Sequence, residues 1–267
     1  MFLKSNGPII LLLTASLLAC SSFSAGPADV GAGNDAGSDV DASVPEPVQP
    51  DASEPDAGSV APCPSTLFCD GFERDTIAGQ WKYPPPSTPG ATSLGIDATT
   101  AASGARSLAV SINVDGKAVP VNELTRSFAA APALPFEVHF ALRVKELPVA
   151  TVRLLRVVFD TGSQVWVGLG PQGMEVGMDA VLTNGGSSSG SNPSELAALD
   201  AWASYTLTVT NTSALLALDN GKHTAAVVPF VAQFGTARSA GLGASHGEAS
   251  SVSWSARFWI DDITMPP

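Results

Sequence analysis

Apolar and polar residues alternate with a period of two along much of the chain beyond residue 63. Shorter runs of this kind cover residues 155–159, 165–169 and 205–209. The clearest run covers residues 136–145, and its apolar members are Phe136, Val138, Phe140, Leu142 and Val144. Successive side chains of a β-strand point to opposite faces, so these runs predict strands that each bury one face.

Turn-forming residues separate the alternating runs. Asp, Asn and Gly cluster at 115–116, 160–162, 184–186 and 219–221, where they favour tight connections between strands. One short helix is predicted at 194–201, directly after Pro193. Many strands joined by turns are typical of a sandwich or a barrel. We therefore predict a single all-β domain, an antiparallel β-sandwich, over residues 63–267.

The N-terminus has the features of an export signal. Lys4 precedes an apolar run at 9–18, which is too short to cross a bilayer as a helix. The run ends in Leu17-Leu18-Ala19-Cys20, which resembles the lipobox of bacterial lipoproteins. The resemblance implies a signal peptide over residues 1–19, cleavage before Cys20 and a lipid on its sulfur. The alternative is an ordinary signal peptide whose cleavage site contains a cysteine.

Residues 20–62 are predicted to be a disordered acidic linker. After Cys20 this segment consists mostly of Ala, Asp, Ser, Gly and Pro, and it contains eight acidic residues and no Lys or Arg. A segment with so few apolar side chains cannot offset the entropy lost on ordering, and its like charges favour extension. The net charge of the whole chain is −12. A nucleic-acid partner is not expected, because such proteins carry a basic face.

Two cysteines open the predicted domain, Cys63 and Cys69. In an exported protein two cysteines this close in sequence predict a disulfide. Metal ligation is the alternative, but no further cysteine or nearby histidine completes a set of ligands.

Several segments, in their order and spacing, resemble the strands of concanavalin A-like, laminin-G-like jelly rolls of bacterial surface proteins. They are residues 68–73 with Trp81 after them, 104–108, 124–128, 202–207 with 218–221, and 258–263. The resemblance extends over 63–267 and implies a jelly-roll sandwich. Because this family is functionally broad, it does not imply one activity.

The resemblance also implies a structural calcium ion where the first and last strands meet. The expected ligands are Asp70, Glu73, Asp261 and Asp262. Simple alternation sends Asp262 to the same face as Ile260, which favours Asp261 as the outward ligand unless a bulge intervenes. Calcium takes six to eight oxygen ligands, carboxylates among them. The alternative is that these acids cap turns or pair with Arg74 and Arg257.

Catalytic patterns are incomplete. The paired acids of laminarinase-type hydrolases are absent, and Glu175 and Asp179 are predicted to be surface residues. Glu123-Leu124 and Val138-His139 resemble two strands of jelly-roll alginate lyases, but the arginine and tyrosine motifs are missing. The sequence at 160–163 resembles the active-site turn of pepsin-type proteases. These enzymes need a second aspartate motif, which is absent, so a hairpin is predicted there.

The remaining prediction is a sugar site on the polar side of three strands. An aromatic platform beside charged hydrogen-bonding groups suits carbohydrate. The predicted members are Glu137, His139, Arg143, Arg156 and Trp166. The alternative is a solvated or loop-covered face with Trp166 partly buried.

Together these features predict a lipoprotein of the bacterial cell envelope, lipid-anchored at the surface or in the periplasm. Its partners would be the membrane, through the lipid, and a polysaccharide or other glycan. The first alternative is a structural or adhesion module without a sugar ligand. The next is a polysaccharide lyase or hydrolase.

Overall fold

The computed structural model describes residues 63–267 except 78, 84–91, 116–120, 183–184, 195, 220–225, 230–233 and 247–251, with only the backbone described at 226–229 and 246. The predicted signal peptide, Cys20 and the linker lie outside these residues. No helix in the described part of the chain is long and apolar enough to cross a membrane.

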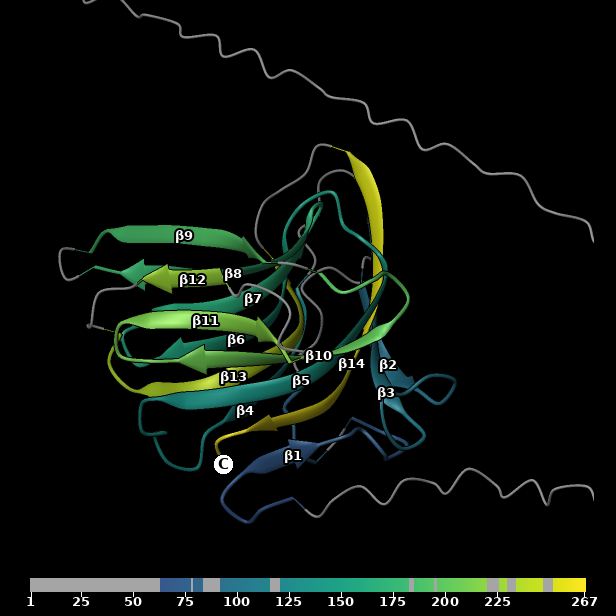
Figure 1. The fold of residues 1–267 in the computed structure, drawn as a ribbon, viewed down its shortest axis with the longest axis horizontal. Helices are drawn as coiled ribbons and strands as arrows, with labels where there is room; N and C mark the ends of the chain where they lie inside the picture. The colour runs from purple at the N-terminus through teal and green to yellow at the C-terminus, as the bar shows by residue number, and fades with distance from the viewer. Residues whose placement is uncertain are drawn as a thin grey trace, which may run out of the picture. The chain divides into compact units, whose positions relative to one another are not determined.

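Two antiparallel sheets pack face to face (Figure 1). The eight-stranded sheet runs in the order β12 (Ala226–Pro229), β11 (Ser213–Leu218), β10 (Trp202–Val209), β5 (Phe136–Glu146), β14 (Ser253–Met265), β3 (Ser107–Asp115) and β2 (Thr92–Asp97), with β1 (Phe68–Asp70) beside the end of β14. The six-stranded sheet runs in the order β4 (Asn122–Ser127), β13 (Ala237–His246), β6 (Val152–Phe159), β7 (Gln164–Gly170), β8 (Gly173–Val181) and β9 (Ser187–Ser194).

The predicted sandwich is confirmed, and the helix predicted at 194–201 is wrong. Ser194 ends β9, and the described residues that follow form an irregular segment. Asp200 has a left-handed backbone with a φ of 62°, which is incompatible with a helix. The Ala197 amide donates to the Tyr205 hydroxyl at 3.0 Å instead of joining a helical ladder.

The core confirms the alternation that the sequence shows. The apolar members of the run at 136–145 are all buried between the sheets. The alternating residues of the shorter runs are buried there too: Leu155, Val157, Phe159, Val165, Val167, Leu169, Tyr205, Leu207 and Val209. Phe140 on β5 stacks on Tyr205 of β10, with the ring centroids 5.6 Å apart. Because one face of each strand is buried in this way, the residues between are directed to the two outer surfaces of the sandwich.

The sequence at 160–163 is the predicted hairpin, between β6 and β7. The Phe159 amide donates to the Ser163 carbonyl at 2.9 Å, and Gly162 supplies the positive φ of 84° that the turn needs. The Asp160 carboxylate accepts hydrogen bonds from the Thr236 hydroxyl and amide. Its role is thus to hold the turn against the start of β13.

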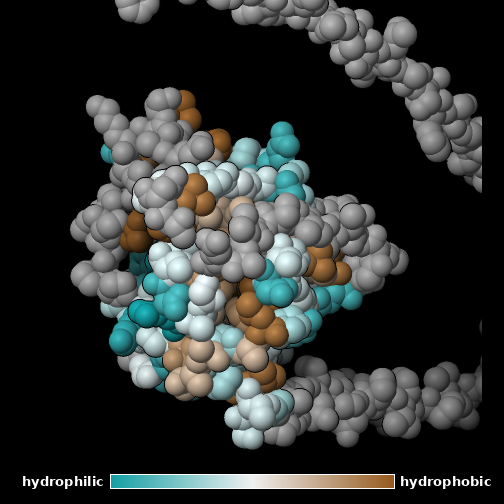
Figure 2. All heavy atoms as spheres, turned by 90° about the vertical axis from the view of Figure 1, so that its left-hand side faces the viewer, coloured by the Kyte–Doolittle hydropathy of each residue, from teal (hydrophilic) through white to brown (hydrophobic). Residues whose placement is uncertain are grey.

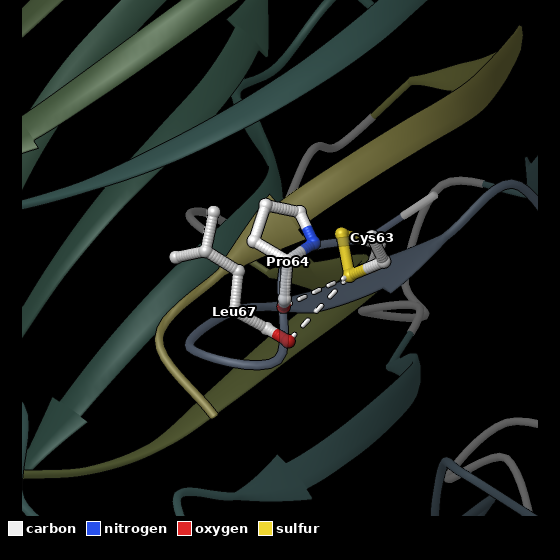
Figure 3. The surroundings of a disulfide bond; sticks show 4 residues. Cys63, Pro64 and Leu67 are labelled. Carbon is white, nitrogen blue, oxygen red and sulfur yellow. Dashed lines mark hydrogen bonds between the residues drawn. A yellow bond between two sulfur atoms is a disulfide. The ribbon is translucent and has the colours of Figure 1, made fainter. Parts of the chain in front are cut away.

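A disulfide joins Cys63 to Cys69 at the start of the domain, as predicted (Figure 3). The two Cα atoms lie 5.8 Å apart, and Cys69 is the middle residue of β1. Since β1 pairs with the end of β14, the bond ties the beginning of the domain to its last strand.

Apolar side chains are scattered on the side of the domain shown in Figure 2, where brown patches are separated by teal and white residues. Exposed large apolar residues on the described surface include Leu134, Val181 and Leu182. A few exposed apolar residues are normal on a protein surface and do not by themselves mark an interface.

Candidate functional site

The outer surface of the six-stranded sheet carries a group of charged and polar side chains that we call the polar face. Its strands direct residues such as Val157, Val165 and Val176 into the core, so the residues between them face outward. The polar face comprises Glu123 on β4, Arg153 and Arg156 on β6, Gln164 and Trp166 on β7, and Glu175 and Asp179 on β8.

A continuous chain of hydrogen bonds crosses the polar face. Arg156 binds Glu123 through two nitrogens, and its Nε lies 2.6 Å from Glu123 Oε1. A third nitrogen of Arg156 donates to Gln164 Oε1 at 3.2 Å, and Gln164 Nε2 donates to Asp179 Oδ2 at 2.5 Å. Arg153 completes the chain with an ion pair of 2.6 Å to the same Asp179 oxygen. Such paired, charge-assisted contacts fix the side chains in place.

Trp166 lies flat on the sheet within this face. Gly177 is its direct partner across β7 and β8, and a Cβ atom there would come within 2.1 Å of the indole. The guanidinium of Arg153 lies 4.8 Å from the ring centroid. Only 5% of Trp166 is exposed. The predicted stacking platform is therefore not available, because glycines let the indole settle onto the sheet under Arg153.

A cavity of about 290 Å³ opens beside Trp166. Its lining combines charged groups of β6 and β8 with the hydroxyl-bearing edge strand β9, and the residues are Thr151, Arg153, Trp166, Glu175, Asp179 and Ser189 to Ser191. The Thr151 hydroxyl donates to Glu175 Oε1 at 3.2 Å. The volume is near the lower end of the range for small-molecule sites. The arrangement can therefore donate to and accept from a small ligand with many hydroxyls.

Glu175 and Asp179 thus line a cavity, although the sequence predicted plain surface residues. The signal was present, because residues four apart on a strand share a face, and Gly177 between them leaves room for an aromatic side chain of the neighbouring strand. Arg153 and Gln164 were also missed, since a single charged or amide residue in a strand predicts only exposure.

The five residues predicted to form one sugar site lie on two different surfaces. Arg156 and Trp166 belong to the polar face, whereas Glu137, His139 and Arg143 leave β5 on the outer side of the eight-stranded sheet. The grouping is wrong, because the core separates these two surfaces. The two lyase-like segments are separated for the same reason, with Glu123 on one sheet and His139 on the other.

The residues of β5 have partners of their own on the outer side of the eight-stranded sheet. His139 Nδ1 lies 2.8 Å from the Thr206 hydroxyl, and His139 Nε2 lies 3.3 Å from Glu137. Arg143 pairs with Asp200 at 2.8 Å. Glu137 and His139 also line a cavity of about 540 Å³, whose other wall is made mainly of proline and aliphatic residues.

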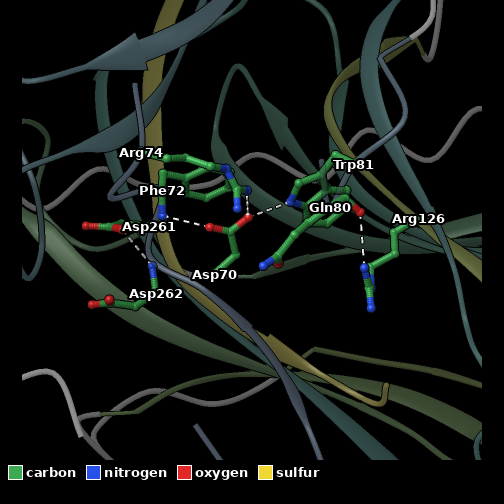
Figure 4. Close-up of polar contacts among 8 residues, drawn as sticks. All are labelled: Asp70, Phe72, Arg74, Gln80, Trp81, Arg126, Asp261 and Asp262. Atoms are coloured by element: carbon green, nitrogen blue, oxygen red, sulfur yellow. Dashed lines mark hydrogen bonds and ion pairs between the residues drawn. The ribbon is translucent and has the colours of Figure 1, made fainter. Parts of the chain in front are cut away.

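The acids predicted to bind calcium are engaged by protein donors. Asp70 accepts from the Phe72 amide at 2.8 Å and from Trp81 Nε1 at 2.7 Å, and it pairs with Arg74 (Figure 4). Glu73 accepts from the backbone amides of residues 105 and 106. Across the described residues, no three His, Cys, Asp or Glu side chains are placed together to hold a metal ion. Asp70 and Glu73 are therefore engaged by protein donors in this structure.

Asp261 faces the outer side of its sheet, as predicted, but it is completely buried. The segment before β3 covers it, and the amides of Ala102 and Ser103 donate to Asp261 Oδ2. The bulge that the sequence left open is present, because the next residue, Asp262, has a φ of 48°. Burial raises the pKa of Asp261 to about 7, against the lowering effect of its backbone donors.

Calcium stays a prediction that melting curves can test. An ion bound by the native state alone raises the free energy of unfolding by RT ln(1 + [L]/Kd). The calcium hypothesis expects a higher melting temperature in millimolar calcium than in excess chelator. Asp70, Glu73 and Asp261 already accept hydrogen bonds from protein donors, and equal melting temperatures would remove the hypothesis.

No protein-family model matches this chain, and no curated protein matches it in sequence. Among solved structures, it is similar to an endo-β-1,4-glucuronan lyase from the fungus Trichoderma reesei, with a TM-score of 0.53 and 13% identity over 74% of this chain and 94% of that one. It is also similar to the cellulose induced protein Cip1, with a TM-score of 0.51 and 14% identity over 73% and 95%. At these identities the likeness shows the fold, a concanavalin A-like jelly roll.

Proposed function

We propose that the domain binds carbohydrate in the cavity of the polar face, and that a lipid on Cys20 holds it at the bacterial cell envelope. The observation that carries the proposal is the cavity itself, where charged groups already fixed by their neighbours line a space next to the hydroxyls of β9. Fixed polar groups favour a hydroxyl-rich ligand, because little further ordering is needed when it binds.

The fold supports the same proposal. One structural neighbour is described as a lyase acting on glucuronan, and the other is named for its induction by cellulose. Because the first of these is described as acting on a polysaccharide, a glycan is the first ligand class to test for this chain.

The geometry favours binding over hydrolysis. Glycosidases need two carboxyl groups about 5–5.5 Å or 6.5–9.5 Å apart. Glu175 accepts from the Thr151 hydroxyl, and Asp179 is bound by both Gln164 and Arg153. Glu123 is held by two bonds to Arg156. We therefore propose a binding module without hydrolytic activity.

Glycan binding is tested with the full-length chain, purified in detergent and applied to an array of plant, fungal and bacterial glycans. Glu175→Ala is expected to weaken binding about tenfold or more, because a hydrogen bond to a charged group is worth about 1.5–3 kcal/mol. Glu137→Ala, on the opposite surface, is the matched control and leaves binding unchanged. An array without any bound glycan, or equal losses for both variants, would refute the proposed site.

Lipid anchoring is expected to depend on Cys20. In bacteria fed labelled palmitate, the chain should take up label and fractionate with membranes, since two or more acyl chains anchor stably. Cys20→Ala is expected to abolish both. The matched control is Cys63→Ala with Cys69→Ala, which removes the other cysteines. Labelling that persists in the Cys20 variant would contradict the anchor.

A further inference from the structure

We propose that the glycan bound by the polar face is neutral rather than a uronate chain, an inference that rests on the proposed function. The charges of the face point to this choice. Both guanidinium groups are already paired, Arg156 with Glu123 and Arg153 with Asp179. Glu175 has a hydroxyl partner, Thr151, but no ion pair with a described cation. The face therefore holds two cationic and three anionic side chains.

A uronate would have to take a guanidinium from its present partner. The Glu123 side chain is only 4% exposed, so releasing Arg156 would leave a buried carboxylate without a counter-charge. Unpaired buried charges are strongly unfavourable. Asp179 is more exposed, at 25%, but it also holds Gln164, so the loss of Arg153 would disturb a second contact.

Repulsion adds to this competition. The carboxylate of Glu175 lines the cavity itself, and Asp179 lies on the same strand at its other end. A ligand carboxylate placed between them would meet like charges in a partly enclosed space, where water screens them less than in bulk. Neither effect acts on a sugar that carries only hydroxyl groups.

A neutral sugar suits the same groups without breaking any pair. Its hydroxyls can donate to the free lone pairs of Glu175 and Asp179, and can accept from the remaining hydrogens of Arg153 and from the serines of β9. Trp166 lines the cavity too, and its buried Nε1 has no hydrogen-bond partner among the described residues.

The test compares each neutral glycan with its own acidic form. Cellohexaose, mannohexaose and a β-1,4-galactan hexamer are titrated into the full-length chain, each beside the same sugar after oxidation of its primary hydroxyls to carboxylates. At least one neutral hexamer is expected to bind ten times more tightly than its oxidised form. Tighter binding of an oxidised form would overturn the inference while supporting the proposed function. If no hexamer binds in either form, the inference fails, and the glycan array decides whether the proposed function fails with it.

A charge-neutral variant separates repulsion from shape. Glu175→Gln keeps the size of the side chain and its hydrogen bond to Thr151, but removes one negative charge. The ratio of neutral to oxidised affinity is expected to fall at least fivefold in this variant. Glu137→Gln on the opposite surface is the matched control and leaves the ratio unchanged. An unchanged ratio in Glu175→Gln would show that charge does not set the preference, which contradicts the inference.

Discussion

Arg156→Met is expected to lower the free energy of unfolding by about 3–5 kcal/mol, because it leaves a buried charge without its partner. The Glu123 side chain, which loses its ion-pair partner in this variant, is only 4% exposed, whereas the Arg156 side chain is 30% exposed. The effect should therefore be asymmetric. Glu123→Met leaves a guanidinium that can still reach water and Gln164, so its expected loss is about 1–2 kcal/mol.

Urea unfolding of both single variants and of the double variant measures this asymmetry. The double variant should lose less than the sum of the two, since each single change leaves the other partner unpaired. Arg143→Met is the matched control on the opposite surface. Its partner Asp200 is 55% exposed, so the expected loss is below about 1 kcal/mol. Equal losses for Arg156→Met and Glu123→Met would show that burial of Glu123 does not control the pair.

The stability of the domain is expected to fall as pH rises from about 4 to 7, because of Asp261. Its pKa is raised to about 7 in the native state, whereas an unfolded aspartate ionises near 3.8. Between these values the native state keeps a proton that the unfolded state has lost, so each pH unit favours unfolding by about 1.4 kcal/mol. The full contribution, at most about 4 kcal/mol, is present below pH 4 and lost above pH 7.

Asp261→Asn tests this contribution, since an amide does not titrate. Urea unfolding of both proteins at pH 5 and pH 8 is the measurement, and the loss of stability between the two should be smaller in the variant. Asp200→Asn, at an exposed position, is the control for a general effect of removing a carboxylate. If Asp261→Asn loses as much stability with rising pH as the unchanged protein, Asp261 does not carry the dependence.

Local features of this protein could be predicted from the sequence. The run that contains Phe136 and Phe140 is a strand because its period of two fits one buried and one exposed face. The turn at 160–163 forms because aspartate and glycine accept the backbone angles of a tight hairpin. Cys63 and Cys69 pair because they lie close in sequence on either side of one short turn. Each of these depends on neighbouring residues alone.

Contacts between distant segments decided the rest. Alternation predicts that the side chains of Arg156 and His139 both point away from the core. Only the strand pairing shows that they lie on different sheets, and so on opposite surfaces of the sandwich. The burial of Trp166 depends on Gly177, its partner on the neighbouring strand β8. Asp261 is buried by amides more than 150 residues earlier in the chain. The alternation in a sequence predicts which face of a strand a side chain lies on. Its contacts on that face depend on the tertiary packing of the whole domain.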